Sequence, residues 1–182
     1  ILSRCIRLNI IPLPESVIEK EVMEREHIPD YMAGTVAAFS RGNLGKAFLF
    51  SETGEFLDKK DRVIRIARKL TEMTDGELMD EAKLISDDKE NIKEFLSMLQ
   101  IWYRDVLLYK SVRKKDGLIF KGEAPLIEKQ AGTLSYKAIN KSLDAVEETK
   151  DHLSANVSPA AAIYNMLQNI KDINIPGGKD RW

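Results

Sequence analysis

The strongest constraint on the fold is an apolar pattern in the middle of the chain. Apolar side chains recur there at intervals of three and four residues, the repeat of one face of an α-helix. The residues on this face are Ile92, Phe95, Leu96, Leu99, Trp102, Tyr103 and Val106. The sequence therefore predicts a long helix with a buried stripe. Trp102, Tyr103 and Tyr109 are expected in the core or an interface, since their spacing disfavours the alternative of a ligand-binding box.

Weaker patterns and boundary residues predict helices on both sides of this one. Six helices are predicted over residues 15–26, 30–41, 43–50, 58–73, 76–85 and 124–131. The first should bury Val17, Ile18 and Val22, and Asp30 should be the N-cap of the second. Two more helices follow, one capped by Ser135 and a last one with Pro159 at its first position. Residues 5–11 alternate weakly and predict a short extended segment. The low content of turn formers, 10 Gly and 6 Pro among 182 residues, supports an all-α fold.

The predicted helices fall into two domains. Residues 1–53 hold three short helices that form one compact unit, and residues 51–54 are predicted to be a linker. Residues 54–182 hold about five to six helices, most of them longer. Lys and Arg number 28 and Asp and Glu 29, so the formal net charge is −1. Because neither half is basic, a strongly basic nucleic-acid reader is disfavoured.

Residues suited to metal or nucleotide chemistry are scarce. One cysteine and two isolated histidines, His27 and His152, predict neither a disulfide framework nor a metal site. No apolar stretch reaches the roughly 18 residues that a membrane span needs, so no membrane partner is expected. The segment 42–47 superficially resembles a phosphate-binding loop. Ser40 and Ala47 stand where that loop needs glycine and a hydroxyl, so a plain helix start is the better interpretation.

A basic run lies near the end of the long predicted helix. It comprises Arg104, Lys110, Arg113, Lys114, Lys115 and Lys121. These cations could contact nucleic-acid phosphates. The favoured alternative is a solvated helix end, where cations interact well with the helix dipole.

The triplet Ser3-Arg4-Cys5, followed by a short strand and three helices, resembles the Ser-Arg-Cys motif of AAA+ clamp-loader ATPases. Segment 42–47 resembles the sensor-2 helix start of their lid domain. Segments 101–108 and 154–163 resemble helices in the collar domain of the delta-prime subunits of bacterial DNA polymerase III. The resemblance covers nearly the whole chain. It implies a helical lid in residues 1–53 and a helical collar in residues 54–182.

The resemblance also implies a function. Arg4 would be an arginine finger acting in trans on ATP bound by a neighbouring subunit, with Ser3 and Cys5 holding its backbone. A guanidinium suits the charge that develops on the γ-phosphoryl oxygens. The chain itself would bind no cofactor and catalyse no reaction. Its partners would be the gamma/tau and delta subunits through the collar and, indirectly, the sliding clamp and primer–template DNA, in the bacterial cytoplasm.

One residue separates this interpretation from its main competitor. Gly45 stands where active clamp-loader ATPases carry the sensor-2 arginine, which favours the non-hydrolysing delta-prime type. The alternatives are a fragment of an active, gamma/tau-like ATPase and a stand-alone helical interaction module. Because the chain begins at Ile1 without an initiator methionine, it is expected to be part of a larger protein.

Overall fold

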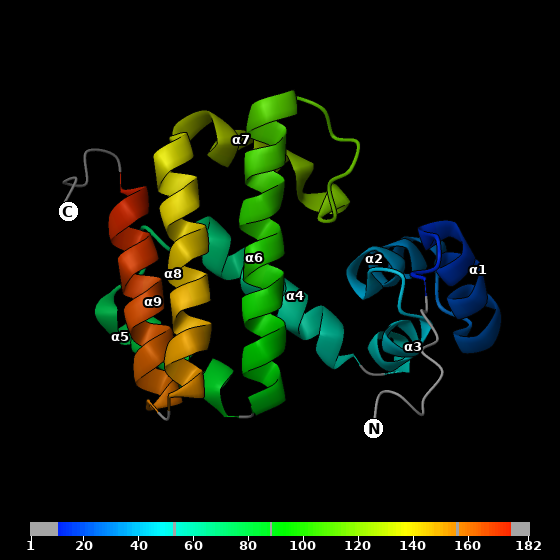
Figure 1. Ribbon diagram of the computed structural model, residues 1–182, viewed down its shortest axis with the longest axis horizontal. Helices are drawn as coiled ribbons and strands as arrows, with labels where there is room; N and C mark the ends of the chain where they lie inside the picture. The colour runs from blue at the N-terminus through cyan, green and yellow to red at the C-terminus, as the bar shows by residue number, and fades with distance from the viewer. Residues whose placement is uncertain (1–10, 53, 88, 156, 176–182) are drawn as a thin grey trace, which may run out of the picture. The chain divides into compact units, whose positions relative to one another are not determined.

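The computed structural model describes residues 11–52, 54–87, 89–155 and 157–175. The chain divides into two compact units, Ile1–Phe56 and Leu57–Trp182 (Figure 1). The described residues form helices and no strand, which confirms the all-α prediction. Most of the predicted extended segment 5–11 lies outside the described residues.

The first unit is built from three helices that pack on one another: α1 (Glu15–Glu26), α2 (Asp30–Ser40) and α3 (Leu44–Glu52). Its core includes an aromatic cluster. The ring of Phe56 stacks on Phe50 with centroids 4.3 Å apart and meets Phe39 edge-on at 5.3 Å. Aromatic pairs in these geometries add to the stability from apolar burial, and they close the unit at its C-terminal end.

Three local predictions for the first unit are wrong. Val17 is 42% exposed, because only Ile18 and Val22 of α1 face the core. Asp30 is the first residue of α2 and Pro29 occupies the cap position, where no side-chain hydrogen bond is made. The predicted linker begins inside α3, which continues to Glu52. Local sequence signals place helix ends to within a few residues only, since packing decides the last turn.

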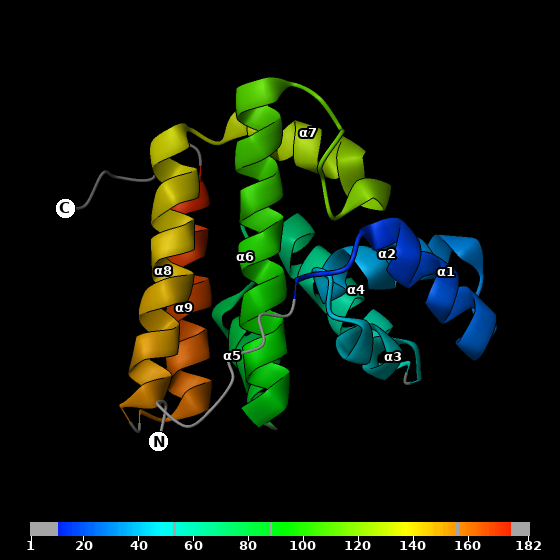
Figure 2. The same cartoon turned by 45° about the vertical axis from the view of Figure 1, so that its right-hand side comes forward.

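Helix α4 (Glu55–Lys69) begins in the last two residues of the first unit and continues into the second. The second unit also contains α5 (Asp75–Ser86), α6 (Lys89–Val112), α7 (Ala124–Thr133), α8 (Tyr136–Ser154) and α9 (Pro159–Asn174), with a short 3₁₀ turn at Lys121–Glu123. Helices α6, α8 and α9 lie side by side, and α5 packs against α9 and α6 (Figures 1 and 2). Helix α7 packs on α6 near the end where α6 finishes and α8 begins. All seven residues of the predicted α6 stripe are buried, as expected.

Two helix starts in this unit follow the sequence rules. The Ser135 hydroxyl accepts a hydrogen bond from the Ala138 N–H at 3.0 Å, so Ser135 caps α8 as predicted. Pro159 begins α9, where its missing N–H is not needed. Helix α4 differs from the prediction, since it begins three residues before Asp58 and ends at Lys69.

Candidate interaction surface of the helical domain

The residues predicted to act on a neighbour's ATP, Ser3, Arg4 and Cys5, lie outside the described residues. The arginine-finger role therefore stays a prediction. Within the described residues, no group of three or more His, Cys, Asp and Glu side chains is arranged to hold a metal ion. His27 and His152 are both exposed and lie in different units.

Segment 42–47 is the start of α3. The Asn43 side-chain oxygen accepts a hydrogen bond from the Lys46 N–H at 3.0 Å, as a helix cap does. The Lys46 ammonium lies 5.0 Å from the centroid of the Phe50 ring on the same helix. Gly45 is exposed in the first turn. These contacts confirm the interpretation of the segment as a plain helix start.

The aromatic residues of α6 form core and not a binding pocket. Trp102, Tyr103 and Tyr109 are 0%, 1% and 6% exposed. The Trp102 ring meets Phe120 edge-on at 5.1 Å, and its indole N–H donates to the Gln130 side-chain oxygen at 2.8 Å. The prediction of a core role is confirmed, and the ligand-box alternative loses its support.

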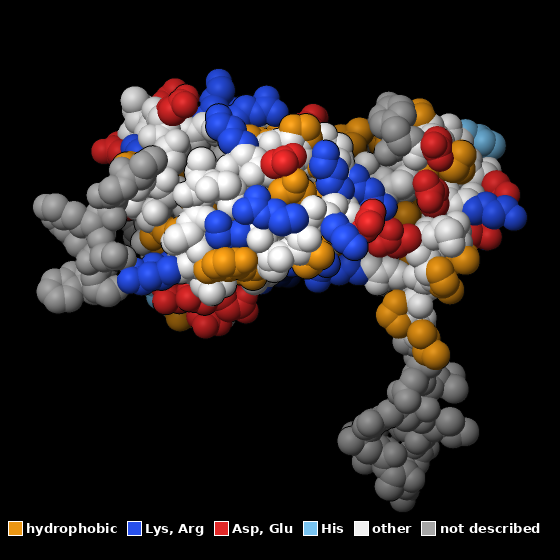
Figure 3. Space-filling model, turned by 90° about the horizontal axis from the view of Figure 1, so that it is seen from above, with side chains coloured by type: hydrophobic (Ala, Val, Ile, Leu, Met, Phe, Trp, Pro, Cys, Tyr) orange, Lys and Arg blue, Asp and Glu red, His pale blue; other side chains and the backbone are white. Residues whose placement is uncertain are grey.

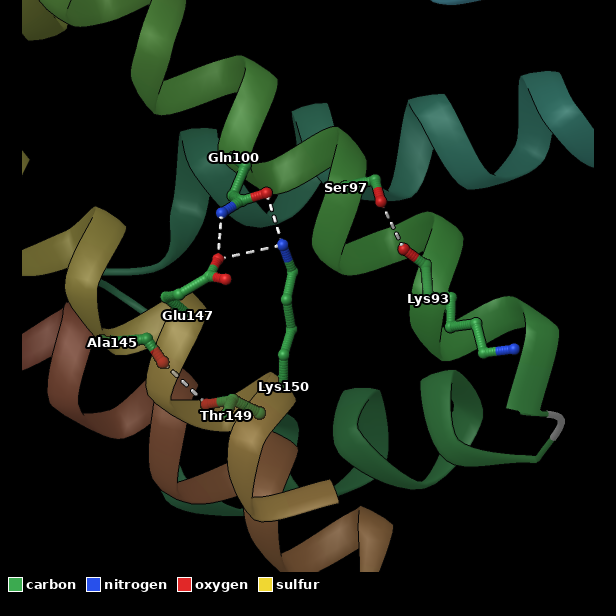
Figure 4. Close-up of polar contacts among 7 residues, drawn as sticks. All are labelled: Lys93, Ser97, Gln100, Ala145, Glu147, Thr149 and Lys150. Atoms are coloured by element: carbon green, nitrogen blue, oxygen red, sulfur yellow. Dashed lines mark hydrogen bonds and ion pairs between the residues drawn. The ribbon is translucent and has the colours of Figure 1, made fainter. Parts of the chain in front are cut away.

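Polar residues at the surface join α6 to α8 (Figure 4). The Gln100 amide nitrogen donates to the Glu147 carboxylate at 2.6 Å, and the Lys150 ammonium donates to Gln100 at 2.5 Å and to Glu147 at 3.1 Å. Hydrogen bonding to the Lys150 ammonium and its charge lower the pKa of Glu147 from its ordinary value. The three side chains hydrogen-bond to one another and link the surfaces of α6 and α8. Their role is therefore structural.

A second polar arrangement joins three elements at the end of α6. The Lys110 ammonium donates to the Ala131 carbonyl at 2.8 Å and lies 5.2 Å from the centroid of the Tyr136 ring. The Tyr136 hydroxyl donates back to the Lys110 carbonyl at 3.3 Å. These contacts hold the C-terminal turns of α6 and α7 beside the first turn of α8. We call the surface formed by these turns and by loop 113–120 the basic end.

The members of the predicted basic run differ in their surroundings. The Arg104 guanidinium donates to the Asp105 carboxylate at 2.7 Å and to the Gly117 carbonyl at 2.8 Å, so it is a structural cation. Lys110 is likewise engaged within the domain. Arg113, Lys114 and Lys115 are exposed on the loop that follows α6. Sequence alone could not separate these two groups, because the carbonyl groups that bind Arg104 and Lys110 belong to residues 13 and 21 positions away.

Residues 56–171 match the family model described as DNA polymerase III, delta subunit, C terminal. This is more than half of the chain, and the chain belongs to that family. The second unit is thus the C-terminal domain of a clamp-loader subunit. No curated protein and no solved structure matches the chain.

The family match does not distinguish the delta from the delta-prime type of subunit. It also begins at residue 56, next to the boundary between the two units, so it leaves the first unit unassigned. No helix among the described residues has the length and apolar character needed to cross a membrane.

Proposed function

We propose that this chain is the C-terminal part of a delta-prime-type clamp-loader subunit, which supports ATP-dependent loading of the sliding clamp without hydrolysing ATP itself. The observation that carries the proposal is the match of residues 56–171 to the family of delta C-terminal domains. Ser3-Arg4-Cys5 and the order of helices add the delta-prime assignment. Gly45 supports it over an active ATPase, because glycine offers no cationic side chain to a phosphate.

Arg4 is the arginine finger in this proposal. It reaches the γ-phosphate of ATP bound on a gamma/tau neighbour, while Ser3 and Cys5 position its backbone. Charge spreads over the γ-phosphoryl oxygens during transfer, and a guanidinium donates to two of them at once while always remaining charged. Lysine keeps the charge and loses the paired donors, which makes Arg4→Lys an informative variant.

The second unit joins the subunit to its neighbours in the same proposal. It contacts the gamma/tau and delta subunits, and the sliding clamp and primer–template DNA are engaged by the assembled complex in the bacterial cytoplasm. Polar links such as Gln100–Glu147–Lys150 support this role, since they fix the relative position of α6 and α8 and keep the outer surface preformed. A preformed surface loses less conformational freedom on association.

Reconstitution tests the assembly part of the proposal. The chain is mixed with gamma/tau and delta subunits and the complex is isolated by size exclusion. Co-elution at fixed stoichiometry is expected. A chain that elutes alone at micromolar concentration contradicts the proposal and favours the stand-alone interaction module.

The finger is tested by ATP hydrolysis. Arg4→Ala in the complete protein is compared with Arg4→Lys and with the neighbouring control Arg7→Ala, in the complex with primed DNA and clamp. An arginine finger accelerates hydrolysis at its own site by about 10³-fold or more. In both Arg4 variants, the total rate of ATP hydrolysis should therefore fall by the part that the ATP site served by Arg4 contributes. In Arg7→Ala the rate should stay unchanged. Wild-type hydrolysis by an assembled Arg4→Ala complex removes the finger role.

A further inference from the structure

The charges of the second unit are unevenly placed. Residues 104–141 contain nine Lys and Arg and four Asp and Glu, a net charge of +5, in a chain whose total is −1. This stretch forms the end of α6, loop 113–120, α7 and the start of α8. Figure 3 views the molecule from this side, and a band of Lys and Arg side chains crosses the second unit there. Because the two halves of the sequence each have nearly balanced charge, the local excess of positive charge in this stretch is not apparent from composition.

Three of the four carboxylates in the stretch are engaged within the domain. Asp105 is fully buried and accepts from the Ile119 and Phe120 N–H groups at 2.7 and 2.8 Å. Glu123 pairs with Arg68 at 3.5 Å. Glu128 hydrogen-bonds the Tyr109 side chain, which raises the pKa of that tyrosine. These three carboxylates are thus poorly placed to neutralise the outward-facing cations, and the fourth, Asp116, is exposed on the loop next to Lys115.

The outward-facing cations Lys114 and Lys115 lie on a loop whose backbone is held at both ends. Arg113 ends α6 with a left-handed φ of 57°, and Gly117 turns the loop with a φ of 84°. Leu118 is buried, and Asp105 binds the backbone just beyond it. The loop is therefore held at both ends, and Lys114 and Lys115 project from a backbone that is already ordered. Preorganised donors lose less conformational entropy when a ligand binds.

Three cations at the basic end are available. Lys114, Lys115 and Lys129 are exposed, and their side-chain ammonium groups make no hydrogen bond or ion pair with any residue that the structure describes. Lys137, in the first turn of α8, adds a further exposed cation to the same surface. Tyr136 beside it is 49% exposed. Exposed cations and an exposed aromatic ring on one surface are the combination that proteins use to bind nucleic-acid backbones and bases.

We propose that the basic end binds the phosphodiester backbone of DNA through Lys114, Lys115 and Lys129. The choice of DNA among polyanions rests on the proposed clamp-loader function. The contact is electrostatic and independent of sequence, because exposed lysines on a loop and a helix read no base edges. It places DNA against the C-terminal domain of this chain itself.

The test measures binding of fluorescein-labelled DNA by anisotropy over a range of salt concentrations. The triple variant Lys114→Gln, Lys115→Gln and Lys129→Gln is compared with Lys20→Gln, Lys83→Gln and Lys89→Gln, which removes the same charge from exposed positions elsewhere. The test triple is expected to lose about tenfold or more in affinity, and its salt slope should fall by about two units on single-stranded DNA and nearly three on duplex DNA, as three lost contacts imply. The control triple should stay within about twofold.

Three arms of the experiment decide the ligand class. Single-stranded and duplex DNA of equal length identify the preferred form, and a loss of binding to either in the test triple supports the proposal. Poly-glutamate of equal charge reports on acidic protein partners. Tighter binding of poly-glutamate than of DNA overturns the proposal, as do equal affinities of the test and control triples. Thermal melts by circular dichroism confirm that both triples are folded.

Failure of this inference is separable from failure of the proposed function. Co-elution of the test triple with gamma/tau and delta subunits reports assembly and not DNA contact. Normal assembly together with undiminished DNA binding removes the basic-end site alone. The wild-type chain could instead fail to assemble while its DNA binding still depends on the three lysines. That result removes the clamp-loader role and keeps the DNA site at the basic end.

Discussion

The buried carboxylate of Asp105 accepts a hydrogen bond from the backbone N–H of Phe120 at 2.8 Å. The same oxygen accepts from the N–H of Ile119, and the other oxygen accepts from Arg104. One side chain of α6 therefore satisfies two donors of a loop that follows it by 14 and 15 residues. A carboxylate with no exposed surface is stabilised by this full set of donors.

Asp105→Ala should lower the free energy of unfolding by about 3 kcal/mol, because it leaves buried N–H groups without an acceptor. Urea denaturation followed by circular dichroism measures the change. Amide exchange at Ile119 and Phe120 should accelerate more than exchange in α9. Asp116→Ala in the same loop is the control, and an equal loss of stability there would show that the loop and not the carboxylate is responsible.

Tyr103 should make stability depend on alkaline pH. Burial raises the pKa of its hydroxyl to about 12, against an ordinary value of 10.0. The folded state then holds the proton more tightly than the unfolded state. The contribution of the Tyr103 hydroxyl to the free energy of unfolding is therefore complete below pH 10 and is lost as the pH rises toward 12. The loss amounts to about 2 to 3 kcal/mol. Denaturation of wild type and Tyr103→Phe between pH 9 and pH 12 measures it, and the phenylalanine variant should lack this component of the slope.

Tyr103→Phe should itself cost about 1 kcal/mol at neutral pH, since the Asn174 amide loses the acceptor that it reaches at 3.1 Å. Asn174 is partly exposed, so water replaces some of that bond. A neutral-pH loss much larger than this would mean that the ring and not the hydroxyl is disturbed.

Gln130 joins three helices, because it accepts from the Trp102 indole and donates to the Ala67 carbonyl at 2.6 Å. Gln130→Ala leaves the buried indole N–H unsatisfied and should destabilise the second unit by about 2 kcal/mol. Urea titration followed by tryptophan fluorescence measures the change. Gln100→Ala, which removes a glutamine from the α6–α8 surface, should cost less than about 0.5 kcal/mol. Similar losses in both variants would contradict the special role of Gln130.

Gly42 should tolerate no side chain. Its φ is 83°, and an added Cβ would lie 2.3 Å from the Pro12 Cβ. Gly42→Ala should therefore destabilise the first unit by about 2 kcal/mol. Gly45→Ala, where the added atom meets only Asn43 at 3.5 Å, should be neutral or stabilise α3 by about 0.5 kcal/mol. Hydrogen exchange of α2 and α3 amides distinguishes the two, and equal protection in both variants would refute the expected clash.

Much of the helix layout could be predicted from sequence, since helix signals are local. The apolar repeat of α6, the Ser135 cap and Pro159 each act within a few residues along the chain. Where a prediction was wrong, as for Val17, the deciding fact was which side of α1 met α2 and α3. A helix with a weak apolar pattern does not fix its own buried face.

The candidate surfaces divide in the same way. The sequence determined by itself that the chain is helical, that its aromatic residues in α6 are core and that a basic run follows them. Only the tertiary structure decided which cations bind within the domain, as Arg104 does to the Gly117 carbonyl and Lys110 to the Ala131 carbonyl, and which remain on the surface. The physical reason is the range of the interactions. Backbone hydrogen bonds and helical periodicity act over about four residues, whereas Gln130 meets Ala67 across 63 residues, and only packing brings such partners together.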